Sequence, residues 1–299
     1  MTDAKLTHAT MATELLPHPL EYALLTPPTV HGDTPLLYLL HGGGGDRSFL
    51  ELMRPGLELA WQRGVLKPCV VATPTAGRSF YLNTFDGRQR WEDLLSGQFL
   101  EHVRNETECA RDRASTAIVG ISMGGMGGLR LAFKHPELFA AVAALEPGIE
   151  AALEWDEVSA EDRFFRGDDL FAELYGSPVD ETKWADDNPA TIASRDPRRL
   201  DDLAIYVECG DEDSFGLHRG AEFLHRVLWD NGVPHQYRLV CGADHLGRTL
   251  PDRFRDAYAF IGQALDPPGP DTSLEPFHNA IRAMRTAAGL SPEWDPHQR

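Results

Sequence analysis

The sequence is poor in cysteine. Its 299 residues include only Cys69, Cys109, Cys209 and Cys241, and their spacing matches neither a disulfide framework nor a metal site. Three of the four, Cys69 and Cys241 among them, are assigned to segments expected to be buried strands, where a reduced thiol packs as a small hydrophobic side chain. We therefore predict no disulfides and no bound metal.

Basic residues and long hydrophobic runs are also scarce. Lys and Arg number 28 against 46 Asp and Glu, which gives a formal net charge of −18. Nucleic acids and anionic membrane surfaces would be repelled by this charge, so neither is expected as a partner. No apolar stretch approaches the roughly 20 residues that span a bilayer, and the first residues lack the basic and apolar segments of an export signal. We expect a cytoplasmic protein.

Strand patterns alternate with helix patterns along the chain, after a lead-in at 1–13 that is expected to be irregular. This alternation predicts an α/β fold with a mostly parallel central sheet and helices on both faces. The expected strands cover 20–26, 36–40, 69–73, 116–121, 140–145, 204–208 and 237–241. The expected helices include a stretch around 52–61, then 91–111, 126–135, 215–231 and 252–265.

The domain organisation follows from changes in composition. Residues 1–265 are predicted to form one α/β domain, with an acidic, aromatic and irregular insertion over the sheet at 148–200. A Pro-rich and Gly-containing cluster at 266–270 starts a C-terminal extension, 266–299. Its amphipathic stretch near 277–284 is expected to dock on the main domain or on a partner. The sequence does not determine the oligomeric state, and a homo-oligomer is one possibility.

The stretch 116–125 organises the rest of the chain. A β-branched run ends in Gly120-Ile121-Ser122-Met123-Gly124 and passes into a helical pattern. Strand, sharp turn and helix around Gly-x-Ser-x-Gly are typical of a nucleophile elbow, in which a strained turn exposes the serine hydroxyl above the sheet. Gly120 and Gly124 are expected to remove side chains that would collide across the bend. Ser122 is the candidate nucleophile.

A serine nucleophile needs a base and an acid that orients the base, here in the chain order serine, acid, histidine. His245, just past the last predicted strand, is the best placed of the twelve histidines. The acid should follow the strand 204–208, where Asp211 and Asp213 both stand. Asp213 is favoured because it precedes a helix and can project toward His245, whereas Asp211 can close the turn. Asp244 is adjacent to the histidine and orients the ring poorly.

The developing oxyanion of an acyl transfer needs two hydrogen-bond donors. The backbone N–H of Met123, the residue after the nucleophile, is one of them. The glycine loop after the strand 36–40 should provide the other. Gly43 is the first choice, with Gly44 as the alternative and a substrate contact.

Five segments together resemble the esterase D-like α/β-hydrolases, which include S-formylglutathione hydrolases, feruloyl esterases and the mycolyltransferase antigens. The resemblance covers about residues 15–265 and implies the α/β-hydrolase fold and a serine esterase or thioesterase without metal or cofactor. By family position it supports Asp213 as the acid and Gly43 with Met123 as the oxyanion donors, and it implies that Tyr81 and Asn83 line the acyl pocket. The segments are 39–44, 79–83 with 90–93, 120–125, 209–213 and 242–245.

These observations lead to one functional hypothesis with two alternatives. The chain is predicted to be a serine carboxylesterase or thioesterase that hydrolyses a small-molecule ester or thioester with a small or medium acyl group. Because His245 must be neutral to accept a proton, activity should fall at acid pH. The alternatives are an acyltransferase that uses the same site, and a catalytically inactive hydrolase-like binding protein.

Overall fold

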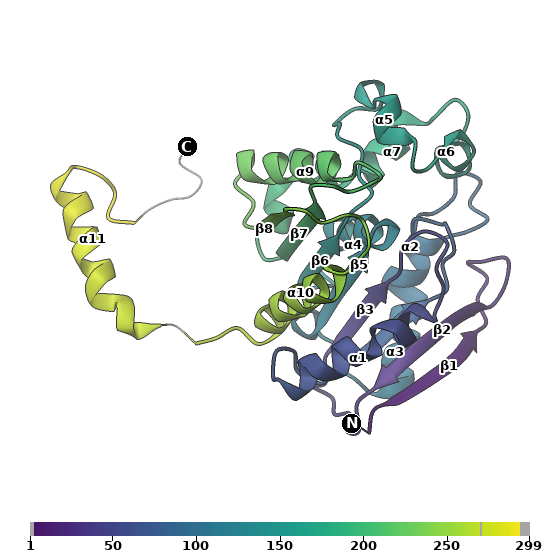
Figure 1. Cartoon of the computed structure of the whole chain (residues 1–299), viewed down its shortest axis with the longest axis horizontal. Helices are drawn as coiled ribbons and strands as arrows, with labels where there is room; N and C mark the ends of the chain where they lie inside the picture. The colour runs from purple at the N-terminus through teal and green to yellow at the C-terminus, as the bar shows by residue number, and fades with distance from the viewer. Residues whose placement is uncertain (1–2, 270, 294–299) are drawn as a thin grey trace. The chain divides into compact units, whose positions relative to one another are not determined.

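The computed structural model describes residues 3–269 and 271–293, and within them eight strands form one sheet (Figure 1). The strand order is β1-β2-β4-β3-β5-β6-β7-β8. β2 runs antiparallel to both β1 and β4, and all other neighbours are parallel. The strands are β1 (Lys5–Met11), β2 (Leu20–Thr26), β3 (Leu36–Leu40), β4 (Val70–Pro74), β5 (Thr116–Ile121), β6 (Ala141–Leu145), β7 (Ala204–Gly210) and β8 (Gln236–Val240).

Helices connect the parallel strands and cover the sheet. A π-helical turn, Leu94–Gln98, joins α2 to α3, so the helix expected over 91–111 is continuous only as far as Thr107. The α-helices are α1 (Phe49–Gln62), α2 (Trp91–Asp93), α3 (Phe99–Thr107), α4 (Met123–Lys134), α5 (Ala160–Arg163), α6 (Asp168–Tyr175), α7 (Glu181–Asp187), α8 (Pro189–Arg195), α9 (His218–Asp230), α10 (Leu250–Leu265) and α11 (Glu275–Ala287).

Both faces of the sheet are buried. In β3, Leu37 and Leu39 pack against apolar residues of α1 and α10 on one face. The alternating residues Leu36, Tyr38 and Leu40 pack on the other face, in a core that α3, α4 and α9 complete. A central strand that is apolar on both sides is typical of a sheet covered by helices on both faces, and this expectation is confirmed.

Two sequence expectations were wrong. Residues 5–11 are not part of an irregular lead-in, because they form the edge strand β1, which pairs along its length with β2. Cys241 is exposed rather than buried, since it lies just past β8, the other edge strand, whereas Cys109 is the third buried cysteine. All four thiols are free.

The segment 148–200 contains α5 to α8. From these helices Phe171, Leu174, Tyr175 and Trp184 enter the same core as α4. The segment is therefore packed against the main domain through buried side chains, most of them aromatic.

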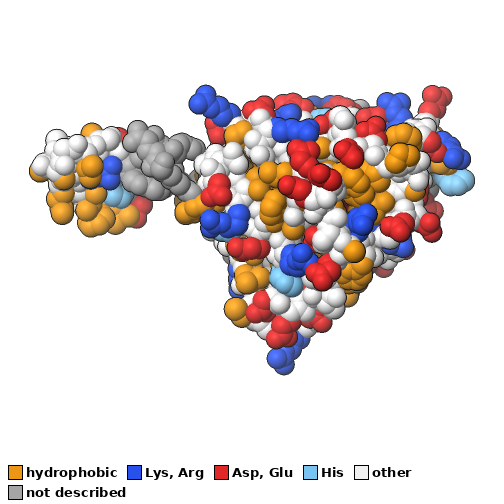
Figure 2. All heavy atoms as spheres, turned by 90° about the horizontal axis from the view of Figure 1, so that it is seen from above, with side chains coloured by type: hydrophobic (Ala, Val, Ile, Leu, Met, Phe, Trp, Pro, Cys, Tyr) orange, Lys and Arg blue, Asp and Glu red, His pale blue; other side chains and the backbone are white. Residues whose placement is uncertain are grey.

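The chain divides into two compact units, 1–265 and 266–299. The described part of the second unit contains α11, whose side chains Phe277 and Met284 are exposed, and hydrophobic side chains are visible on its surface (Figure 2). Among the described residues, no helix has both the length and the hydrophobicity needed to cross a membrane.

Candidate active site

Ser122 occupies a strained turn between β5 and α4. Its backbone has φ +58° and ψ −119°, a conformation that L-residues rarely adopt. The turn is held on both sides, because the Ser122 N–H donates to the carbonyl of Leu145 (2.8 Å) in β6 and its carbonyl accepts from Met126 (3.0 Å) in α4. The strain is thus maintained by the sheet and the helix together.

The two glycines of the elbow are required by close backbone approach. A Cβ on Gly120 would lie 2.1 Å from the carbonyl oxygen of Gly124, across the bend. A Cβ on Gly124 would instead lie 2.3 Å from the carbonyl oxygen of Leu40 in β3. Gly120 therefore permits the turn itself, whereas Gly124 permits α4 to approach the neighbouring strand.

His245 and Asp213 form a buried pair at the ends of β8 and β7. His245 Nδ1 lies 2.7 Å from Asp213 Oδ2, and the Asp213 side chain has no exposed surface. The other carboxylate oxygen accepts from the N–H groups of Phe215 (2.8 Å) and Leu217 (3.0 Å). Because the Asp213 oxygen accepts at Nδ1, the proton of neutral His245 belongs there and Nε2 is left as an acceptor.

The environment of Asp213 favours its ionised form. Burial acts to raise the pKa of this carboxyl, but the hydrogen bond with His245, with help from Glu146 and the N–H of Leu217, lowers the pKa to about 2. The carboxylate is therefore ionised at neutral pH. The edge-on ring of Phe215, 4.7 Å from that of His245 between centroids, covers the imidazole.

The other two candidate carboxylates point elsewhere. Asp211 Oδ1 accepts from the N–H of Gly242 (2.6 Å), which joins the loops after β7 and β8. Asp244 Oδ1 accepts from the N–H (2.8 Å) and hydroxyl (2.5 Å) of Ser214 and from the N–H of His245 (2.6 Å). Of the three carboxylates, only that of Asp213 is hydrogen-bonded to the His245 ring among the described residues.

The glycine loop after β3 passes beside the elbow. A Cβ on Gly42 would lie 3.4 Å from that of Ser122. The N–H groups of Gly43 and Met123 donate no hydrogen bond to any described residue, so both are available, whereas Gly44 donates to the carbonyl of Gly77 (2.7 Å). Geometry therefore favours Gly43 over Gly44 as a donor to a ligand.

His41 holds this loop in place. Its Nε2 accepts from the N–H of Ala76 (3.0 Å), while Nδ1 donates to the carbonyl of Gly42 (2.7 Å). Burial lowers the pKa of His41, so the ring stays neutral and keeps both bonds. A Cβ on Gly45 would lie 2.7 Å from His41 Nδ1, which explains a glycine at this position.

Ser122 and His245 line one cavity of about 450 Å³, together with Gly43 and Met123. Most residues of its walls are apolar. Arg78, from the 74–90 loop, adds a positively charged side chain to the lining. The aromatic and aliphatic lining residues carry no sequence signal for this role, and they include Phe49, Leu52, Met53, Phe80, Phe165, Phe215, Leu217, Leu246 and Leu250.

Three residues expected at the substrate do not line this cavity. Tyr81 is fully buried and its hydroxyl donates to the carbonyl of His41 (3.1 Å). Asn83 Oδ1 accepts from the N–H of Glu92 (2.9 Å) at the start of α2. Gly44 lines a neighbouring depression along the glycine loop, which shares Gly42, Gly43, Phe49 and Leu52 with the cavity. Tyr81 and Asn83 therefore support the loops around the cavity, and the neighbouring Phe80 enters it instead.

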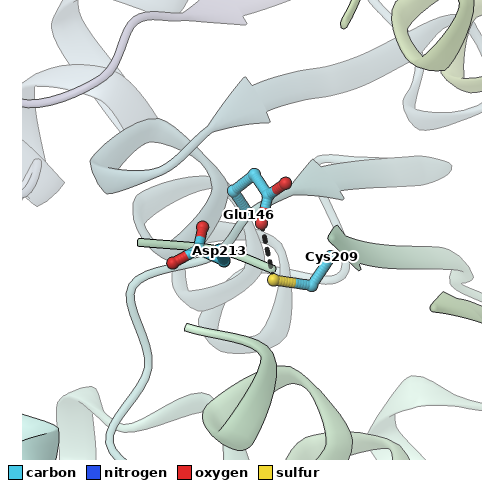
Figure 3. A group of neighbouring side chains, drawn as sticks. All are labelled: Glu146, Cys209 and Asp213. Carbon is cyan, nitrogen blue, oxygen red and sulfur yellow. Dashed lines mark hydrogen bonds between the residues drawn. The ribbon is translucent and has the colours of Figure 1, made fainter. Parts of the chain in front are cut away.

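Glu146, just past β6, lies directly behind the Asp213–His245 pair. It has no exposed surface and a left-handed backbone (φ +46°). Its carboxylate accepts from Cys209 Sγ (2.5 Å) and the N–H of Gly210 (3.0 Å), and it pairs with Arg253 of α10. One carboxylate oxygen each of Glu146 and Asp213 and the sulfur of Cys209 lie within 4.8 Å of one another. Figure 3 shows the three side chains together.

This cluster does not suit a metal ion. Arg253 already supplies a positive charge to Glu146, and His245 with two backbone N–H groups occupies the oxygens of Asp213. Burial, with the nearby carboxylates, raises the pKa of the Cys209 thiol well above its ordinary range, so it is not the thiolate that metals require. Burial likewise raises the pKa of Glu146 to about 7, against the opposing effects of Cys209 and Arg253.

Comparison with known proteins identifies the family of the chain. Residues 13–245 match the family described as "Putative esterase". Esterase Rv1288 of Mycobacterium tuberculosis (strain ATCC 25618 / H37Rv) is 29% identical over 240 residues, which cover 74% of this chain and 50% of that protein. An acetyl esterase of Caldicellulosiruptor saccharolyticus is 29% identical over 113 residues, which cover 38% of this chain and 41% of that protein. The chain thus spans about half the length, or less, of these curated relatives.

Solved structures share the fold. A ferulic acid esterase superposes with a TM-score of 0.73 at 20% identity, over 89% of this chain and 100% of the other. An S-formylglutathione hydrolase from Agrobacterium tumefaciens superposes with a TM-score of 0.72 at 17% identity, over 89% and 97%. The superpositions show the α/β-hydrolase fold. Because the family match covers more than half of the chain, the chain belongs to the putative esterase family.

Proposed function

We propose that the chain is a serine carboxylesterase or thioesterase that acts through an acyl-enzyme. The observation that carries the proposal is the strained Ser122, which lines the same apolar cavity as His245, whose ring is held by Asp213. A strained serine and an oriented imidazole that line one cavity are the groups that acyl transfer needs. The membership in an esterase family supports the same reaction.

In the proposed mechanism Ser122 Oγ attacks the carbonyl carbon while His245 Nε2 takes its proton. Asp213 holds the ring and stabilises the imidazolium, and the N–H groups of Gly43 and Met123 bind the oxyanion. Collapse of the tetrahedral intermediate expels the alcohol or thiol, which takes the proton from His245. Water, deprotonated by His245, then attacks the acyl-enzyme, releases the carboxylic acid and restores Ser122.

The test is the hydrolysis of p-nitrophenyl acetate by Ser122→Ala. Without the nucleophile, kcat should fall by roughly a thousandfold or more. Ser273→Ala, which removes an exposed serine in the second unit, is the matched control and should retain the wild-type rate. Equal turnover by wild type and Ser122→Ala would refute the proposal.

Two further measurements separate the alternatives. A fluorophosphonate probe should label the wild type but not Ser122→Ala, as read by intact mass. Failure to label the wild type would favour an inactive hydrolase-like binding protein. Product analysis with added alcohols and amines should yield mainly the free acid, and a dominant acyl-transfer product would instead identify an acyltransferase.

A further inference from the structure

A second apolar cavity, of about 550 Å³, lies between α1 and α10. We call it the α1/α10 groove. Three residues, Leu52, Met53 and Leu250, line both the groove and the cavity of Ser122 and His245. The two spaces therefore share a wall and lie next to each other on the surface of the first unit.

The groove has the chemistry of an alkyl-chain site. Ala60, Phe254 and Tyr258 are buried in it, whereas Leu52 and Leu59 leave 73% and 43% of their surface exposed. Large exposed leucines beside an active site indicate a surface that an apolar ligand covers. The charged lining residues are Arg63, Asp252 and Arg255, and the last two pair with each other (2.7 Å).

The length of the groove limits the ligand. Residues 52 and 63 mark its extent along α1, and at the helical rise per residue they are about 16 Å apart, close to an extended chain of about twelve carbons. A compact acetyl group would not reach past the shared wall. A long acyl chain, in contrast, would continue from the carbonyl at Ser122 into the groove.

We propose that the α1/α10 groove binds the acyl chain of a medium- to long-chain ester, of about eight to twelve carbons. The inference rests on the proposed esterase function and extends the expected acyl group beyond small ones. The acyl chain is favoured over the alcohol because it stays bonded to Ser122 after the alcohol has left, so the groove would hold it through both steps, and its contacts would raise kcat/KM by stabilising the acylation transition state relative to free enzyme and ester. Each methylene buried there should raise kcat/KM about threefold to fourfold.

The first experiment is a chain-length series of p-nitrophenyl esters from acetate to dodecanoate, with decyl acetate as the comparison for the alcohol side. We expect kcat/KM to rise from acetate to decanoate by at least tenfold, and little gain for decyl acetate over ethyl acetate. A flat profile with Ser122-dependent acetate turnover would overturn the groove assignment and leave the esterase proposal intact. A gain confined to decyl acetate would mean that the groove binds the alkyl chain of the leaving alcohol, and this would overturn the acyl assignment. Absence of turnover with every ester would refute both proposals.

The second experiment fills the groove. Gly56 lies inside α1, and a Cβ there would make ordinary contact with Tyr258 at 3.8 Å, so Gly56→Phe is sterically accessible and its ring would occupy the groove. We expect the ratio of decanoate to acetate kcat/KM to fall at least tenfold. Leu59→Asp, at a half-exposed lining position, should lower the same ratio by placing a charge there without overfilling the site.

Gln62→Phe is the matched control, because this exposed residue of α1 lines neither space. It should keep the wild-type ratio. A ratio that survives both Gly56→Phe and Leu59→Asp would overturn the proposal. If those variants instead change the sedimentation coefficient at high protein concentration while the ratio stays fixed, the groove is a contact between copies of the chain and the acyl assignment is wrong.

Discussion

Asp211 and Asp213 are two residues apart and have different partners. Asp213 is buried and hydrogen-bonded to the His245 ring, whereas Asp211 is exposed and accepts from the N–H of Gly242 in the loop after β8. An aspartate in this loop can thus orient a catalytic base or connect two loops. Which of the two it does depends on the groups that lie opposite its side chain. Their carboxamide variants separate these roles with the same chemical change.

Asp213→Asn should lower kcat by roughly a thousandfold to ten-thousandfold. The amide no longer stabilises the imidazolium and can favour the wrong ring tautomer. Asp211→Asn, the matched control, should retain kcat within about threefold and lose only part of one exposed hydrogen bond. Both are measured with p-nitrophenyl acetate. A larger loss in Asp211→Asn than in Asp213→Asn would reverse the assignment of the acid.

Glu146 predicts a pH-dependent stability. Burial raises the pKa of this carboxyl from its ordinary value of 4.5 to about 7, so the native state holds this proton over a pH range in which the unfolded chain has released it. The native state binds more protons, and its free energy of unfolding therefore falls as pH rises from about 4.5 to 7 through this group. The groups that face Glu146 are Cys209, Asp213 and Arg253.

Glu146→Gln removes the ionisation, so the variant does not lose the stability that wild type loses through this group as pH rises. The free energy of unfolding of the variant minus that of wild type should therefore increase from pH 5 to pH 8, by up to about 3 kcal/mol. Urea unfolding at both pH values measures the difference. Glu212→Gln, at an exposed position near the same loop, gives the baseline. A difference that is equal at the two pH values would show that Glu146 is not protonated in the native protein near neutrality.

At the scale of elements, α4 and α2 are joined by a buried charge cluster. Arg130 has no exposed surface and donates to Glu92 (2.6 Å), to Asp187 (3.0 Å) and to the carbonyl of Tyr81 (2.5 Å). The last bond fixes a residue with φ +58° immediately after Phe80, which enters the active-site cavity. The cluster therefore positions the 74–90 loop at the site.

Arg130→Ala should lower the free energy of unfolding by about 3–5 kcal/mol. The substitution leaves two buried carboxylates without their main cation, although Lys134 still pairs with both. Arg195→Ala is the control, because its ion pair with Asp186 is exposed and should contribute less than about 1 kcal/mol. Urea unfolding measures both. Similar losses in the two variants would mean that the cluster does not stabilise the fold.

The strongly periodic elements could be predicted from the sequence, and the weakly patterned ones could not. The buried strand 36–40 and the turn at Ser122 have unambiguous local signals, and the structure contains both. β1 was missed because an edge strand leaves much of one face exposed, so Lys5–Met11 lacks a hydrophobic run and depends on its pairing with β2.

The approach of Asp213 to His245 could be expected, because both follow neighbouring parallel strands at one edge of the sheet. The lining of the cavity could not. Which of Phe80 and Tyr81 enters it depends on two consecutive left-handed backbone conformations, and neither residue type indicates one. Glu146 carried no sequence signal either, since its burial depends on Arg253, more than a hundred residues away in the chain.

At the scale of the whole molecule, the first unit contains both hydrophobic cores and every candidate site residue. The last buried residue of those cores is Ile261 in α10, among the described residues. In the second unit, α11 has no buried residue, and hydrophobic side chains are exposed on it (Figure 2). The two units therefore differ in how they are stabilised, and a truncation at their boundary tests the difference.

A chain that ends at Leu265 should unfold cooperatively and keep its kcat/KM for p-nitrophenyl acetate within about twofold, since the core and the site are complete without 266–299. A chain that ends at Arg248 is the control. It lacks Phe254, Ala257 and Ile261 of α10, and removal of several buried core side chains, each worth about 2–5 kcal/mol, exceeds the stability of a typical domain. Circular dichroism and urea unfolding report the folded state of each. If the chain that ends at Leu265 folds but loses more than tenfold in kcat/KM, residues 266–299 contribute to the reaction and the first unit is not sufficient for it.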